Sequence, residues 1–184
     1  MTLRATLETL TLPLRDPFVI ARASHGRGRT VTTVVLELRD EADGPDGPVG
    51  LGEGFPDRYY GETTATMAAV LPLLLDAVAP ITGDLRGGPD EARAALEAAD
   101  GLMATAISGH GAAKCALDIA LHDLVGRRLG LPVHALLAVE GDVPPTDFTL
   151  GIDDPAVVAE GARRAGDFPA LKIKGGGAAD LPPL

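Results

Sequence analysis

Thr146-Asp147-Phe148-Thr149-Leu150-Gly151 and, further along the chain, Pro169-Ala170-Leu171-Lys172-Ile173-Lys174 are two short runs with the composition of β-strands. Between them, Asp154-Pro155 is typical of a helix start, because Asp is a favoured N-cap and Pro is favoured at the first helical position. That helix is expected to reach about Ala165. Two strands joined by a helix of this length are expected to pair in parallel. The sequence therefore predicts a β-α-β unit.

Lysine is rare in this chain, and the second run holds two of the three lysines among the 16 basic residues. Lys172 and Lys174 are two positions apart, and side chains i and i+2 of a strand point to the same face. A second positive charge nearby and burial both favour the neutral form of a lysine, which can accept a proton; an arginine cannot take this role. The pair is therefore a candidate acid/base site.

A second interpretation of the lysine pair is simple solvation. Alternating polar and apolar residues are what any half-buried strand shows, and lysine is common on edge strands. Taken alone, the pattern favours solvent-facing charges. The residues of this segment leave both interpretations open.

Composition limits the class of protein. With 46% hydrophobic and 23% charged residues, the chain is globular and can bury a core. Its net charge of −10 argues against a nucleic-acid partner. No apolar run is expected to reach the ~20 residues of a membrane span and no signal peptide is recognised, so no membrane partner and a cytoplasmic location are expected. The single Cys115 cannot form an internal disulfide and is expected to be a small buried residue.

The amino-terminal part contains three runs typical of strands, at 3–14, 30–38 and 49–54, which together predict an antiparallel meander. Between the first two lies a polar loop, at about 16–29, that could bind an anion, although a solvated loop is the favoured interpretation. The cationic residues in and beside this loop are Arg15, Arg22, His25, Arg27 and Arg29. The third run carries glycines at alternate positions, Gly50, Gly52 and Gly54, but it lacks the spacing and the following helix of a dinucleotide-binding fingerprint.

From Thr63 onward the pattern is helical. Helices are predicted at 63–78, from Gly88-Pro89-Asp90 to Ala99, and at about 111–129. The last is the clearest, because its apolar residues recur at the spacing of one helix face and Gly130 with Pro132 ends it.

Asp118 and His122 lie four positions apart on this third helix, a spacing that also occurs in metal sites. We expect a surface pair instead, because a third ligand is absent nearby and i, i+4 pairs of this kind are commonplace.

Taken in order, the motifs of the whole chain resemble the enolase superfamily, in its muconate-lactonising and mandelate racemase branch, and within it the dipeptide epimerases of the L-Ala-D/L-Glu type. Each motif alone is weak evidence, but their order and spacing are specific. The resemblance therefore favours a catalytic K-x-K strand over solvated lysines. The motifs are Pro13-Leu14 with Pro17-Phe18, Gly50-Leu51-Gly52-Glu53-Gly54, Tyr60-Gly61-Glu62-Thr63, Ala112-Ala113-Lys114-Cys115-Ala116-Leu117-Asp118-Ile119-Ala120-Leu121-His122-Asp123-Leu124, Gly130-Leu131-Pro132-Val133, Thr146-Asp147-Phe148-Thr149 and Leu171-Lys172-Ile173-Lys174-Gly175.

The resemblance implies an α+β capping domain, an antiparallel meander plus helices, at residues 1–130. Residues 131–184 then form the first β-α-β of a truncated (β/α) barrel, which stops after the second strand. A complete barrel of this type needs about 250 residues. We therefore expect either that another chain supplies the remaining strands or that the chain is a fragment, and that the isolated 184 residues are inactive.

The resemblance also implies roles for particular residues. The lysine that matches Lys174 exchanges the α-proton of the substrate, and the lysine that matches Lys172 favours the neutral form of its partner. Mg²⁺ stabilises the enolate in the complete family enzyme, but its carboxylate ligands lie on later strands, so no metal ligand is expected in this chain. Thr149, on the first barrel strand, and Arg22, in the loop after the first strand of the chain, are candidate substrate-binding residues.

The activity implied is that of an isomerase, a dipeptide epimerase-like enzyme or its amino-terminal part. Muconate cycloisomerase and o-succinylbenzoate synthase share the cap and the K-x-K strand, so either reaction is an alternative parent activity. A further alternative is an inactive fragment that acts only as a binding or dimerisation module. The expected partners are a small-molecule dipeptide and either a second copy of the chain or a complementing barrel chain.

Overall fold

The computed structural model describes residues 2–20, 23–25 and 30–176. The chain divides into two compact units. Unit 1 consists of residues 1–10 and 32–140, and unit 2 of residues 11–31 and 141–184. The assignment of residues 1–130 and 131–184 to two domains remains a prediction.

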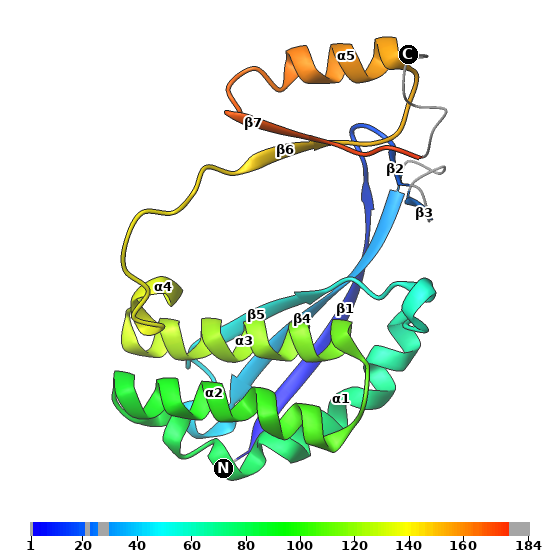
Figure 1. The fold of residues 1–184 in the computed structure, drawn as a ribbon. Coiled ribbons are helices and arrows are strands. Elements are labelled where there is room, and N and C mark those ends of the chain that lie inside the picture. Colours follow the sequence, from blue (N-terminus) through cyan, green and yellow to red (C-terminus); the bar gives the residue numbers. More distant parts are fainter. Residues whose placement is uncertain (1, 21–22, 26–29, 177–184) are drawn as a thin grey trace. The chain divides into compact units, whose positions relative to one another are not determined.

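A three-stranded antiparallel sheet in the order β1-β4-β5 is built from β1 (Leu3–Pro13), β4 (Thr30–Asp40) and β5 (Val49–Gly54), and most of its residues belong to unit 1 (Figure 1). In the β4-β5 pair, Leu36 lies opposite Gly52. Val34, Leu36 and Leu38 of β4 supply one face of the core, because alternate residues of a strand point to the same side. The predicted antiparallel meander is confirmed.

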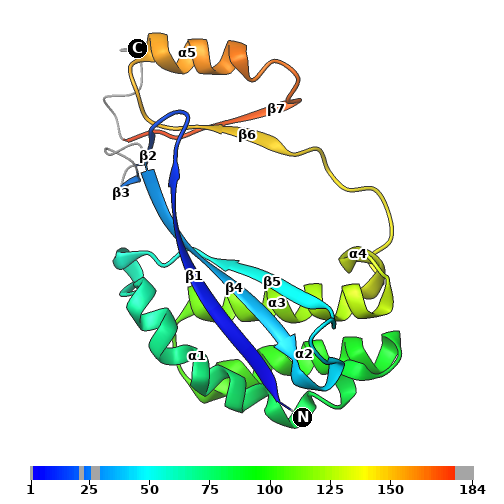
Figure 2. The same ribbon diagram turned by 180° about the vertical axis from the view of Figure 1, so that it is seen from behind.

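Three long helices cover one face of this sheet: α1 (Thr64–Val78), α2 (Pro89–Ala106) and α3 (Gly111–Leu129) (Figures 1 and 2). The predicted bounds of α1 and α3 are confirmed to within one residue. Helix α2 runs beyond the predicted end at Ala99, because Met103 continues the buried stripe of its inner face. The short helix α4 (Val133–Leu136) was not predicted.

Short 3-10 turns connect these elements. They are η1 (Glu41–Asp43), η2 (Arg58–Tyr60), η3 (Ala79–Ile81) and η4 (Asp84–Arg86).

The alternating glycines of β5 allow this strand to lie directly against α3. A Cβ added at Gly50, Gly52 or Gly54 would meet the backbone oxygen of Ala120, Ala116 or Ala112, respectively, well inside van der Waals contact. The three alanines recur every fourth residue, so they form one line along the helix. The glycines therefore serve close packing of a strand on a helix, and not a phosphate-binding loop.

Glu62 stabilises the start of α3. Its carboxylate is buried and accepts hydrogen bonds from the Ala112 backbone N–H at 3.1 and 3.3 Å. His110, the N-cap residue of α3, has a left-handed backbone conformation, and its side chain makes no capping hydrogen bond. A negative charge at a helix start is favourable because the first backbone N–H groups lack partners within the helix.

Helix α1 is unusually apolar. With the turn that follows, the segment Thr64–Ile81 has a mean hydropathy of 1.7, and by length and composition alone it could cross a membrane. This corrects the expectation that no apolar run approaches the length of a membrane span. One side of α1, with Met67, Leu71 and Leu74, is buried in the core of unit 1, which accounts for the apolar residues on that side.

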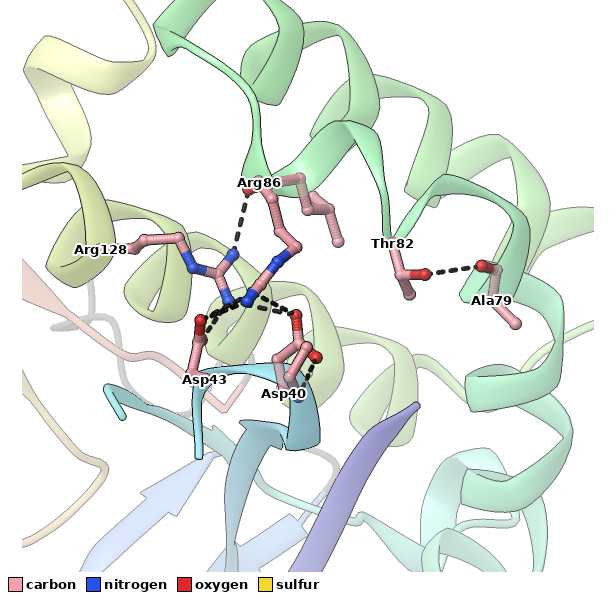
Figure 3. Close-up of polar contacts among 8 residues, drawn as sticks. Asp40, Asp43, Ala79, Thr82, Arg86 and Arg128 are labelled. Atoms are coloured by element: carbon pink, nitrogen blue, oxygen red, sulfur yellow. Dashed lines mark hydrogen bonds and ion pairs between the residues drawn. The ribbon is translucent and has the colours of Figure 1, made fainter. Parts of the chain in front are cut away.

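A group of four charged side chains joins three parts of unit 1 (Figure 3). Arg86, from η4, bonds Asp43 at 2.6 Å and Asp40 at 3.1 Å. Arg128, from the last turn of α3, bonds Asp43 at 2.6 Å and the Leu85 carbonyl at 3.1 Å. We refer to Asp40, Asp43, Arg86 and Arg128 as the ion cluster.

Unit 2 contains two small sheets (Figure 2). Strands β2 (Phe18–Ile20) and β3 (Ala23–His25) pair antiparallel, so the segment predicted as a loop at 16–29 contains a hairpin. The short strand β3 was not predicted, because a polar composition alone does not indicate a strand.

The second small sheet of unit 2 consists of β6 (Asp147–Leu150) and β7 (Ala170–Ile173), which pair in parallel and are joined by α5 (Pro155–Arg164). This confirms the predicted β-α-β unit. Asp154 stands at the N-cap of α5, but its side chain makes no capping hydrogen bond.

Candidate functional site

The candidate lysines lie at the end of the parallel sheet of unit 2. Thr149 of β6 is the register partner of Lys172 of β7. Lys174 follows directly after β7, and its backbone N–H donates to the Leu150 carbonyl at 3.0 Å, so it continues the ladder. Partners in register and residues two apart share a face, which brings Thr149, Lys172 and Lys174 to one face of the sheet.

Helix α5 packs against the opposite face of this sheet. Leu150, in register with Ile173, is buried, and its Cδ2 lies 2.9 Å from where a Cβ on Gly161 of α5 would stand. The Phe148 ring meets the Phe168 ring with centroids 5.2 Å apart. Because Phe148 and Leu150 face α5, Thr149 and the two lysines must face away from it. We call this side, with Thr149, Lys172 and Lys174, the lysine face.

Exposure differs along the lysine face. Lys172 is exposed, whereas Thr149 and Lys174 are half-buried. The sequence pattern predicts the shared face of Lys172 and Lys174, whereas the place of Thr149 on that face comes from the strand register. Their catalytic roles remain predictions, and Arg22, the fourth candidate residue, lies outside the described residues.

The described part of unit 2 also contains a pocket of about 570 Å³, which is lined by Thr149 of the lysine face but by neither lysine. Its walls come from residues 14–18, from β6 and the turn after it, and from α5. Sequence reasoning missed this pocket. Phe18, Phe148 and Phe168 line the pocket. The sequence shows these phenylalanines but gives no sign that they lie close together in the fold.

The family resemblance implies a magnesium centre, which would need several ligand side chains close together. Nowhere in residues 2–20, 23–25 and 30–176 do three or more His, Cys, Asp or Glu side chains come together in a way that could hold a metal ion. Mg²⁺ requires several oxygen ligands in near-octahedral geometry. The side chains described here therefore do not fit a magnesium centre by themselves.

The Asp118–His122 pair on α3 is confirmed as a local pair of one helix. The His122 Nδ1 lies 2.9 Å from the Asp118 carbonyl oxygen and 3.4 Å from its carboxylate Oδ1. The hydrogen bond to the Asp118 side chain is the main cause of a raised pKa of His122, and burial opposes it.

The expectation that Cys115 is buried is wrong. Cys115 is exposed, because it falls on the outer side of α3 while Ala116 and Leu117 turn inward.

Comparison with known proteins places the chain in a family. Residues 4–138 match the N-terminal domain of mandelate racemase and muconate lactonizing enzyme. This match covers more than half of the chain, and the chain belongs to that family, which confirms the resemblance to the capping domain of the enolase superfamily.

Individual relatives are similar over most of this chain. It is 34% identical over 172 residues to the L-Ala-D/L-amino acid epimerase of Pedosphaera parvula, a match covering 92% of this chain and 45% of that protein. The dipeptide epimerase of Enterococcus faecalis V583, in complex with Mg and the dipeptide L-Leu-L-Tyr, has a TM-score of 0.73 and 30% identity, covering 95% of this chain and 46% of that chain.

The muconate lactonizing enzyme of Mycobacterium smegmatis, in complex with muconolactone, has a TM-score of 0.71 and 26% identity, and the match covers 95% of this chain and 44% of that chain. This chain therefore spans less than half of the length of the proteins it matches.

Proposed function

We propose that this chain provides the capping domain and the first two barrel strands of a dipeptide epimerase-like enzyme. In this proposal Lys174 removes and returns the α-proton of a dipeptide carboxylate, Lys172 lies beside it on the same face, and Thr149 contacts the substrate. The observation that carries the proposal is the shared face of Thr149, Lys172 and Lys174 on a parallel strand pair, in a chain similar to dipeptide epimerases over nine-tenths of its length.

The lysine face has the chemistry that proton exchange requires. A lysine can act as acid and base in turn, because it can exist in both protonation states. The half-buried position of Lys174 agrees with the role of the base, and the more exposed Lys172 with the role of its neighbour. When bound, Mg²⁺ would stabilise negative charge on the substrate carboxylate. Its ligands would have to come from polypeptide other than the residues described here.

Two other functions deserve a test. Muconate cycloisomerase or o-succinylbenzoate synthase activity is favoured by the fold similarity to the muconate lactonizing enzyme, whose TM-score is nearly that of the dipeptide epimerase. A binding or dimerisation module without catalysis is favoured by the absence of a metal-ligand cluster among the described residues. The cytoplasmic location remains part of the proposal.

The test measures exchange of the substrate α-proton for deuterium by ¹H NMR, with a panel of L-Ala-L-Xaa dipeptides and with cis,cis-muconate, in the presence and absence of Mg²⁺. The protein is this chain fused to the part of the Enterococcus faecalis epimerase that follows the matched region. Lys174→Ala is expected to abolish exchange. Lys114→Ala is the matched control, because Lys114 is the one remaining lysine and bonds the Ile107 carbonyl in unit 1.

The outcomes separate the candidates. Dipeptide exchange that is lost in Lys174→Ala and kept in Lys114→Ala would support the epimerase assignment. Conversion of muconate without dipeptide exchange would favour the cycloisomerase. A folded fusion that is active on neither substrate would contradict the epimerase proposal, and analytical ultracentrifugation of the 184-residue chain would then test the dimerisation module.

A further inference from the structure

We propose that unit 2 carries a second binding site, distinct from Lys172 and Lys174, for a small anion with an apolar body. Its volume of about 570 Å³ lies within the roughly 300–1,000 Å³ range of small-molecule sites. Phe148 and Leu150, which face α5, are part of its wall, and Thr149 also lines it, whereas Lys172 and Lys174 do not. A ligand in this pocket would therefore not contact the proposed catalytic lysines.

The wall of the pocket is aromatic. Three of the four phenylalanines of the chain, Phe18, Phe148 and Phe168, line it. Phe148 is 37% exposed and Phe168 41% exposed, although their rings are in contact. Large apolar side chains that remain open to solvent as a group mark binding surfaces, because aromatic rings gain most when a partner covers them.

The charges at the rim indicate an anion. Arg164 is paired with Asp16 at 3.2 Å, and the Asp153 carboxylate accepts the Asp154 backbone N–H at 2.8 Å. Arg15 is exposed, lines the pocket, and has no hydrogen-bond or ion-pair partner within the described part of the chain. An arginine is always charged and presents paired N–H donors, which suit a carboxylate.

The ligand class that matches this wall and rim is a carboxylate with a phenyl or branched aliphatic body. The body would lie against Phe148, Phe168 and Val157, and the carboxylate would approach Arg15. The probe is 3-phenylpropionate. Acetate is the control that has the carboxylate but lacks the apolar body. The second control, 3-phenylpropylamine, has the same apolar body with a positive charge, and Asp153 would favour that charge.

The experiment is an amide chemical-shift titration of the ¹⁵N-labelled 184-residue chain. The readout residues are Gly151 and Gly161, which line the pocket. Saturable shifts of both with 3-phenylpropionate, and none with acetate, are expected. Arg15→Gln is expected to weaken binding about threefold, as for an exposed ion pair, and Phe168→Ala about fivefold. The matched control is Arg163→Gln, since Arg163 lies on α5, pairs with Glu160 and does not line the pocket.

Four results would overturn the proposal. They are the absence of saturable shifts, binding of the amine at least as tight as that of the carboxylate, equal binding by the Arg15→Gln variant, and concentration-dependent shifts of the same glycines without any probe. The last would mean that a second copy of the chain covers the pocket. Binding that persists in Lys174→Ala separates this site from the proposed catalytic face, so either proposal can fail without the other.

Discussion

Asp43 and Arg128, 85 positions apart in the sequence, are joined by a hydrogen bond of 2.6 Å between the Asp43 Oδ2 and the Arg128 Nη2. Both side chains are 14% exposed. The bond links the turn after β4 to the last turn of α3, and Arg86 bonds the other oxygen of the same carboxylate. The ion cluster therefore holds three elements of unit 1 at one point.

Arg128→Met is expected to lower the free energy of unfolding by about 3 kcal/mol, because removal of one partner leaves the carboxylates of a mostly buried cluster without compensation. Urea denaturation followed by circular dichroism measures the change. Arg127→Gln is the control on the adjacent residue: Arg127 is 54% exposed and pairs with Asp123, so its loss should cost less than about 1 kcal/mol. Equal effects of the two substitutions would contradict a structural role for the cluster.

Gly52→Ala is expected to destabilise unit 1 by at least about 2 kcal/mol, because the new methyl group must displace the backbone of α3 at Ala116. Thermal and urea unfolding measure the loss. Gly83→Ala is the control, because a Cβ at Gly83 has no atom within 4 Å and the backbone there is right-handed helical. It should leave stability unchanged or raise it slightly. A Gly52 variant as stable as the wild type would refute the close contact between β5 and α3.

The raised pKa of His122 predicts a pH dependence of stability. A histidine whose pKa is higher in the folded than in the unfolded state contributes stability below its unfolded pKa, near 6.5, and loses this contribution as pH rises through the folded value. The free energy of unfolding should therefore fall slightly, by less than about 1 kcal/mol, as pH rises from 6 to 8. Asp118→Asn removes the cause and should flatten this part of the profile. If the free energy of unfolding of Asp118→Asn varied with pH in parallel with that of the wild type, the Asp118–His122 pair would not contribute to the pH dependence of stability.

Magnesium is expected to bind weakly to the 184-residue chain, because the described residues supply no cluster of three carboxylate or imidazole ligands. Isothermal titration calorimetry with MgCl₂ measures this directly. The fusion described for the epimerase test should bind Mg²⁺ more tightly. Tight binding by the chain alone would locate a metal site that the described residues do not show.

The local patterns of the sequence were sufficient for most elements. The apolar spacing and the terminal glycine gave the bounds of α3, and β-branched composition located β4. The β-α-β unit followed from two apolar runs and an Asp-Pro helix start. Local residue patterns predict an element less well where tertiary contacts determine it. Helix α2 continues past Ala99 because Met103 is buried in the core, and β3 forms because its backbone pairs with β2.

The sequence by itself determined the family, the strand that carries Lys172 and Lys174, and the fact that both share a face with each other, because these follow from order, spacing and the two-residue period of a strand. Only the tertiary structure decided that this face is the one turned away from α5, since that depends on which side of β6 the helix packs. Three features depend on segments far apart in sequence. They are the close packing of α3 on Gly50, Gly52 and Gly54, the ion cluster, and the pocket beside Arg15, which has no partner among the residues that the structure describes. Long-range contacts of this kind are fixed by shape and burial, which local residue patterns do not record.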